Sequence, residues 1–95
     1  MIQDITHLRR RGYSRAPLQL FGRRWCAHTQ MLRRQLDRAG IPYVYRDMDI
    51  DRSAASQVRW WTGMDVNPVL YVDGEVLVEP GLHEVNWALR RHALA

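Results

Sequence analysis

The only cysteine of the chain, Cys26, lies in residues 22–30 (GRRWCAHTQ), between an apolar run and a segment of helical pattern. A cysteine in the first turn of a helix that follows a strand lies where unpaired backbone N–H groups converge and where the helix dipole favours an anion. Cysteines in such places ionise more readily than a free thiol, above all beside arginine. Because Arg23 and Arg24 precede it closely, we expect Cys26 to be largely thiolate at neutral pH and therefore nucleophilic.

The neighbours of Cys26 differ in what their spacing allows. Thr29 lies three residues further on the same helical face, so its hydroxyl can reach the sulfur. His28 is two residues on and faces elsewhere, which disfavours a cysteine–histidine nucleophile–base pair and predicts an exposed residue beside the site. The competing interpretation of Cys26 is an apolar filler without chemistry, since buried cysteines are common.

A second feature is the pair Asn67-Pro68, which stands directly before a strand candidate. Proline cannot donate to a strand ladder, so it belongs at the first residue of a strand, and only X-Pro bonds adopt the cis form cheaply. A cis Pro68 would present the backbone of Asn67 to a molecule that docks against the sulfur.

Alternating strand and helix patterns must position these residues. The clearest is the Asp73-Gly74 pair between two β-rich runs, which predicts a two-residue hairpin because that turn needs positive φ. The predicted order is strand 17–21, helix 27–39, strand 43–48, helix 52–62 capped by Asp51 and ended by Gly63, strands 69–72 and 75–78, and a last helix from about residue 81. The predicted inner faces are Leu18 and Leu20; Met31, Leu32, Leu36 and Ala39; Ala54, Ala55, Val58 and Trp61; and Leu82, Val85, Leu89 and His92.

This order predicts an α/β fold of βαβαββα type. Two parallel strands joined by a right-handed crossover and a hairpin on the other edge give a four-stranded mixed sheet with helices on both faces. Residues 1–14 are predicted as an N-terminal extension with a short helix, and residues 15–95 as the domain itself.

The corner Trp25-Cys26, the spacing Gly63-x-x-x-x-Pro68 and the hairpin that follows resemble glutaredoxins over about residues 16–93. The chain is most similar to the mycoredoxin-like branch, with tryptophan before the cysteine. The resemblance implies a thioredoxin-like fold and a thiol-disulfide oxidoreductase. Its partners would be S-thiolated or disulfide-containing client proteins and a low-molecular-weight thiol, glutathione or mycothiol.

The resemblance also implies roles for individual residues. Cys26 is the attacking thiol, supported by Thr29, and Pro68 matches the cis proline. Gly81 and Leu82 match the turn where family members hold a ligand carboxylate on backbone amides. The residues expected to contact the small thiol are Arg23, Trp25, Asn67, Pro68, Gly81 and Leu82.

Several positions depart from the family pattern. Thr29 replaces the second cysteine, so no intramolecular disulfide can form and turnover needs an outside thiol. Asp65 occupies a position that is often basic, and its charge would repel carboxylates of a small thiol. Val66-Asn67 and Pro80-Gly81 replace the usual residues before the proline and the last helix.

Two other functions stay open. A thioredoxin-fold binding module could have lost redox turnover and hold a partner through its basic surface or tryptophans. A dimer could bridge an iron–sulfur cluster with one Cys26 per chain and external thiols, although the chain lacks the Cys-Gly-Phe-Ser motif of that type. Trp60 and Trp87 lie outside the predicted apolar faces of their helices. We expect them to pack against the rest of the chain, not to form a docking surface.

Composition narrows the classes further. The chain has 95 residues and a net charge of +4, so it forms one domain, and all 14 of its cations are arginine. The arginine runs are scattered among elements, which favours solvated faces over nucleic-acid binding. One cysteine excludes an internal disulfide framework, and the four histidines show no metal-ligand spacing. Short apolar runs and the absence of a signal-like start predict a cytoplasmic protein that does not span a membrane.

Overall fold

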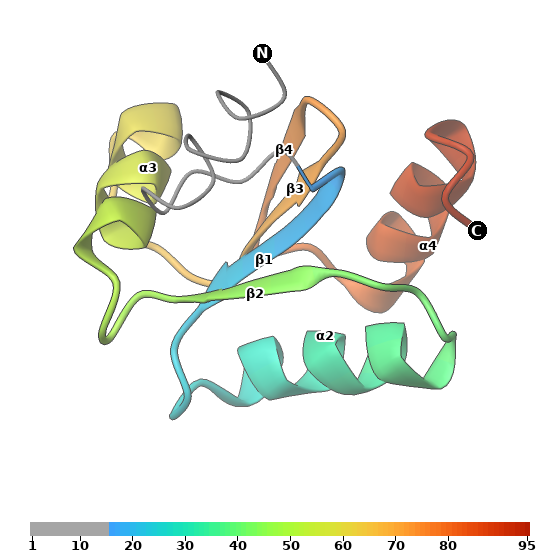
Figure 1. The fold of residues 1–95 in the computed structure, drawn as a ribbon, viewed down its shortest axis with the longest axis horizontal. Helices are drawn as coiled ribbons and strands as arrows, with labels where there is room; N and C mark the ends of the chain where they lie inside the picture. The colour runs from blue at the N-terminus through green and yellow to red at the C-terminus, as the bar shows by residue number, and fades with distance from the viewer. Residues whose placement is uncertain (1–15) are drawn as a thin grey trace, which may run out of the picture.

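The computed structural model describes residues 16–95, and the predicted N-terminal helix and extension, residues 1–14, lie outside that range. The described chain follows the predicted order of strands and helices (Figure 1). The elements are β1 (Leu18–Gly22), α2 (Ala27–Arg38), β2 (Val44–Asp47), α3 (Arg52–Thr62), β3 (Val69–Val72), β4 (Glu75–Val78) and α4 (Leu82–Arg91).

The strands form a mixed sheet of order β2-β1-β3-β4. β1 runs parallel to β2 and antiparallel to β3, and β3 and β4 form an antiparallel hairpin. Gly22 is in register with Asp47, and Phe21 with Val69. The loops that follow β1 and β2 and the loop that precedes β3 therefore meet at one end of the sheet.

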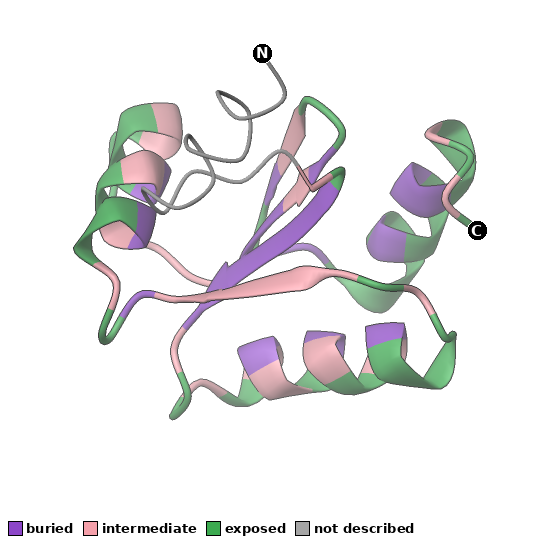
Figure 2. Ribbon diagram, in the orientation of Figure 1, coloured by how far each residue is buried: buried purple, intermediate pink, exposed green. Residues whose placement is uncertain are grey.

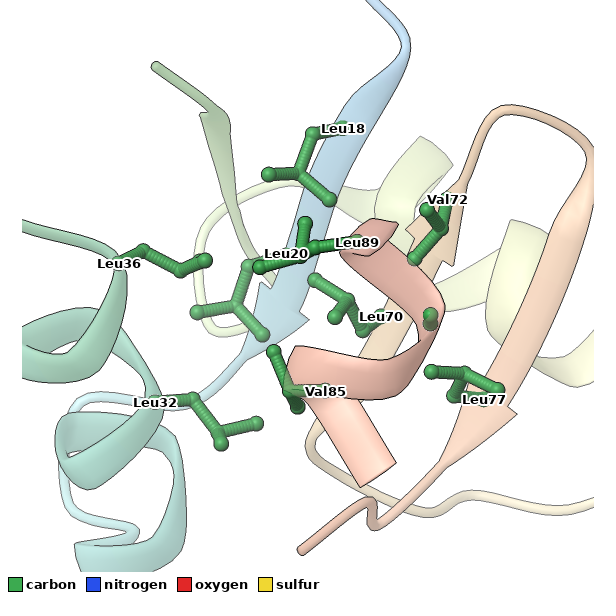
Figure 3. Packing of buried hydrophobic residues seen from close by; sticks show 10 residues of the cluster. Leu18, Leu20, Leu32, Leu36, Leu70, Val72, Leu77, Val85 and Leu89 are labelled. Carbon is green, nitrogen blue, oxygen red and sulfur yellow. The ribbon is translucent and has the colours of Figure 1, made fainter. Parts of the chain in front are cut away.

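Side chains alternate between the two faces of the sheet, as the period of a strand requires. Leu20 and Leu70 pack under α2 and α4, whereas Phe21 and Val69 pack under α3 on the other face. Figure 1 shows α3 apart from α2 and α4, and Figure 2 shows the central strand β1 buried along its length. Figure 3 shows the larger cluster, which contains Leu18, Leu20, Leu32, Leu36, Leu70, Val72, Leu77, Val85, Ala88 and Leu89.

α3 has the limits and the inner face that its sequence predicts. The Asp51 carboxylate accepts hydrogen bonds from two backbone amides of the first turn, and Gly63 ends the helix with φ 75°. Trp61 stacks on Tyr71 and meets Phe21 edge to face, with ring centroids 5.3 and 5.2 Å apart. These contacts fix α3 on its face of the sheet.

The inner faces of α2 and α4 are narrower than predicted. Leu32 and Leu36 are buried together with Thr29, whereas Met31 and Ala39 are exposed. Leu82 of α4 is also 43% exposed. Met31, Ala39 and Leu82 line an open groove between the two helices instead of filling the core.

The hairpin forms at the predicted turn. Asp73 and Gly74 both have positive φ, 42° and 102°, as a turn of type I′ demands. Val72 is in register with Glu75, so the turn contains two residues. It lies at the end of the sheet opposite to Cys26, because Val72 is paired with Leu18 at the start of β1.

Candidate functional site

Cys26 is the N-cap residue of α2, directly after the loop that leaves β1. Its backbone N–H donates to the Arg23 carbonyl at 3.1 Å, and its carbonyl accepts from the Gln30 amide at 3.1 Å. The residue is half-buried, and its sulfur has no hydrogen bond from the residues that the structure describes. This position at a strand-to-helix corner does not fit an apolar filler sealed in the core.

Thr29 is fully buried below Cys26, in the first turn of α2. The sequence predicts that its hydroxyl supports the Cys26 sulfur. In the structure the hydroxyl instead donates to Asn67 Oδ1 at 3.3 Å, which ties α2 to the loop before β3. Thr29 also lies against Gly22, where an added Cβ would be 2.4 Å from the Thr29 methyl carbon.

The Asn67–Pro68 peptide bond is cis, as its sequence position predicts. Pro68 is buried, and its carbonyl accepts from the Glu79 amide at 2.8 Å. Through the Thr29–Asn67 hydrogen bond, this loop lies beside the first turn of α2. Pro68 and the corner that carries Cys26 therefore meet at the same end of the sheet.

Arg23 contacts two loops beside the corner. Its guanidinium pairs with Asp49 at 2.9 Å and with Asp65 at 3.2 Å. The hydrogen bond to Asp49 raises the pKa of Arg23, and the same bond lowers the pKa of Asp49 below its ordinary value. The sequence predicts that Arg23 supports the thiolate or a ligand and that the charge of Asp65 repels ligand carboxylates, and the structure pairs the two residues with each other.

Arg24 adds to this network. Its side chain pairs with Asp47 at 3.3 Å, and its backbone N–H donates to Asp49 at 3.4 Å. We call the five residues Arg23, Arg24, Asp47, Asp49 and Asp65 the Arg23 cluster. It holds three carboxylates against two guanidinium groups, and therefore one excess negative charge.

The turn before α4 is fixed to α2. His28 Nε2 lies 2.7 Å from the Pro80 carbonyl, and the Gln35 amide donates to the Leu82 carbonyl at 3.0 Å. His28 is therefore half-buried, not exposed as the sequence predicts. The Gly81 N–H, which the resemblance assigns to a ligand carboxylate, donates to Glu84 Oε1 at 3.3 Å.

Large apolar side chains are exposed around the corner. Trp25 exposes 73% of its surface, Ile50 75% and Met64 53%. Ile50 and Met64 are neighbours in sequence of Asp49 and Asp65, which Arg23 holds beside the corner. Sequence reasoning missed both residues, although an isolated apolar residue in a polar loop is the available signal.

Two further tryptophans, Trp60 and Trp87, to which the resemblance assigns no role, are also exposed. Trp60 exposes 83% of its surface and Trp87 57%. Trp87 lies near the guanidinium groups of Arg90 and Arg91, which are 5.9 and 5.8 Å from its ring centroid. The expectation that Trp60 and Trp87 pack against the rest of the chain is therefore wrong for residues 16–95.

The described residues show neither a metal-ligand group nor a membrane span. Within residues 16–95, no three side chains of histidine, cysteine, aspartate or glutamate gather closely enough to hold a metal ion. In the same range, no helix combines the length and the apolar character needed to cross a bilayer.

Comparisons with known proteins agree with the fold. The glutaredoxin family model matches residues 18–77, well over half of the chain. No curated protein matches the chain. A glutaredoxin from Archaeoglobus fulgidus is similar in structure with a TM-score of 0.73 and 16% identity, over 81% of this chain and 89% of the other.

Two plant structures are similar as well. A reduced glutaredoxin from Populus tremula x tremuloides has a TM-score of 0.61 and 22% identity, over 83% of this chain and 68% of its own. A buckwheat glutaredoxin in complex with glutathione has a TM-score of 0.62 and 20% identity, over 98% of this chain and 82% of its own. The chain therefore belongs to the glutaredoxin family and has the thioredoxin-like fold.

Proposed function

We propose that the chain is a cytoplasmic thiol-disulfide oxidoreductase that uses Cys26 alone to reduce mixed disulfides between client proteins and a small thiol. The observation that carries the proposal is the half-buried thiol at the N-terminus of α2, in a member of the glutaredoxin family. A thiol in such a position is accessible to an incoming disulfide.

The proposed reaction has two exchange steps. The Cys26 thiolate attacks the small-thiol sulfur of the mixed disulfide, a new disulfide forms between Cys26 and the small thiol, and the client leaves as a thiolate that takes up a proton. A second small thiol, deprotonated, then attacks the small-thiol sulfur of that disulfide. This step releases an oxidised small-thiol dimer and restores Cys26. Thr29 stands where a second cysteine would act, so the resolving thiol comes from outside the chain.

The residues around the corner supply the proposed docking groove. Trp25 is exposed beside the sulfur, Asn67 and Pro68 border α2 on one side, and Gly81 and Leu82 border it on another. The buckwheat relative is a glutathione complex, which makes glutathione one candidate for the small thiol. Mycothiol is the other candidate, on the resemblance of the Trp-Cys corner.

The test is adduct formation followed by turnover. The reduced protein is exposed to glutathione disulfide and, separately, to mycothiol disulfide, and its intact mass is measured. We expect a one-to-one mixed disulfide on the wild-type protein and none on Cys26→Ser, together with reduction of a small mixed disulfide by the wild type only. The absence of an adduct with both disulfides would refute the proposal.

A binding module without turnover is the second candidate. The exposed Trp25, Ile50 and Met64 around the corner favour it, because clustered apolar side chains on a surface mark docking sites. Cys26→Ser separates the two functions: a redox enzyme loses its activity toward clients, whereas a binding module retains its partner.

A further inference from the structure

Two groups that could hold a carboxylate of a ligand lie in loops at the corner or against the first turn of α2, and both are already bound to carboxylates of this chain. The Arg23 side chain is 19% exposed, and its guanidinium pairs with Asp49 and Asp65. The Gly81 N–H at the start of α4 donates to Glu84. The residues in these contacts come from four different loops and a helix, so the contacts are independent observations of the same arrangement.

The charge that remains is negative. The Arg23 cluster carries one excess carboxylate, and the side chain of Asp65 is 64% exposed. Glu84 is exposed in the first turn of α4, and its carboxylate has Gly81 as its partner. An incoming anion would have to displace these carboxylates or remain close to them, and like charges at short range are unfavourable.

The position of the cluster relative to the sulfur makes this charge relevant. The Arg23 carbonyl accepts the Cys26 amide, so the cluster begins three residues from the thiol. Asp65 lies three residues before Pro68, in the loop that Thr29 binds through Asn67. The loop of Asp65 therefore contacts the first turn of α2, the helix that Cys26 caps. Glu84 binds Gly81, whose neighbour Pro80 contacts His28 in the same turn.

We propose that this site selects disulfides whose small-thiol half is uncharged or cationic, and discriminates against thiols that carry carboxylates. Asp65 and Glu84 are the specificity-determining residues. The inference rests on the proposed function and names the chemical class of its small thiol. Of the two candidates it disfavours glutathione, which carries two carboxylates. In the first exchange the Cys26 thiolate attacks the small-thiol sulfur, a disulfide forms between Cys26 and the small thiol, the old disulfide breaks, and its other half leaves as a thiolate that is protonated.

The experiment compares three small disulfides of similar size. Cystamine carries two positive charges, bis(2-hydroxyethyl) disulfide none, and 3,3′-dithiodipropionate two negative charges. The rate of adduct formation on Cys26 is measured by intact mass. It is divided by the rate at which the same disulfide reacts with 2-mercaptoethanol, and this normalisation corrects for the intrinsic reactivity of each disulfide. We expect normalised rates in the order cystamine, hydroxyethyl disulfide, dithiodipropionate, with about a two- to fourfold step for each change of charge at low salt. The steps should shrink in high salt, because the Debye length is only about 3 Å at 1 M.

Charge-neutral variants test the assignment to residues. Asp65→Asn and Glu84→Gln should each raise the normalised rate of dithiodipropionate relative to hydroxyethyl disulfide by about two- to fourfold. Glu84→Gln keeps an oxygen that can accept from Gly81, so it removes the charge while the cap is retained. The matched control is Asp73→Asn at the hairpin turn, which removes the same charge at the opposite end of the sheet and leaves all three rates unchanged.

The outcomes separate the two proposals. Adducts on Cys26 whose normalised rates do not follow charge, or whose ratio is the same in wild type, Asp65→Asn and Glu84→Gln, overturn the charge selection and leave the redox function standing. The absence of an adduct with all three disulfides overturns the proposed function, and the charge selection with it.

Discussion

Gly22 lies where β1 leaves the sheet, and replacing it with alanine should destabilise the corner that carries Cys26. A Cβ at this position would be 2.4 Å from Thr29 Cγ2, 2.6 Å from Thr29 Oγ1 and 3.1 Å from Thr29 Cβ. Ordinary contacts between non-bonded carbon atoms are about 3.5–4.0 Å. Thr29 is fully buried, so it cannot retreat into solvent, and the first turn of α2 must move.

The cost follows from two opposing sets of effects. Overpacking a buried site costs about 1–3 kcal/mol, and displacement of the Thr29–Asn67 hydrogen bond costs about 0.5–1.5 kcal/mol more. Replacing glycine with alanine also restricts the unfolded chain, which offsets about 0.4–1 kcal/mol of this destabilisation. We therefore expect Gly22→Ala to lower the free energy of unfolding by about 2 kcal/mol.

Urea unfolding of four proteins measures this: wild type, Gly22→Ala, Thr29→Ala and the double variant. Gly22→Ala should move the midpoint down by about 1–2 M. Thr29→Ala alone should also destabilise, but it removes the two closest atoms, so the double variant should be more stable than additivity predicts by about 1 kcal/mol. Gly81→Ala is the control, since its Cβ would have nothing within 4 Å. There the lost N-cap preference and the reduced entropy of the unfolded chain oppose each other, and the change should stay within about 0.5 kcal/mol. Unchanged stability of Gly22→Ala, or an additive cycle, would refute the steric reasoning.

Two predictions concern the supports of the fold. Asp51→Ala removes the carboxylate that caps α3 and should cost about 1–2 kcal/mol in urea unfolding, whereas Asp51→Asn, which can still cap, should cost less. Hydrogen bonds from Arg91 and then His92 lower the pKa of Glu75. Its stabilising effect is thus present above the ordinary pKa of a glutamate and is lost as the pH falls through the lowered folded-state value. Unfolding curves between neutral pH and about pH 3 should therefore show a smaller loss of stability for Glu75→Gln than for wild type, and parallel losses would contradict this.

The sequence predicted those parts of the fold that depend on local signals. The Asp73-Gly74 turn, the Asp51 cap and the Gly63 end of α3 each need only a few neighbouring residues, and the structure has them where the sequence places them. Local spacing also distinguishes the two adjacent tryptophans of α3. The helical period places Trp61 on the inner face, where it packs against Tyr71.

The parts that failed depend on contacts between distant segments. Arg23 reaches Asp49 and Asp65, which lie 26 and 42 residues away, and no local pattern reveals such partners. Thr29 can reach either the sulfur or a neighbouring loop from the same helical face, and only the position of Asn67 decides which. The exposure of Met31 follows likewise from the place that α4 takes beside α2, where the two helices leave an open groove.

The contact between His28 and the Pro80 carbonyl determines where one hydrogen atom lies. A carbonyl oxygen can only accept, so Nε2 must carry the proton in the neutral ring as well as in the charged one. The neutral imidazole is thereby held in a single tautomer, with Nδ1 as its lone acceptor. The junction between α2 and the turn before α4 therefore has a defined donor, the His28 ring, and a defined acceptor, the Pro80 carbonyl.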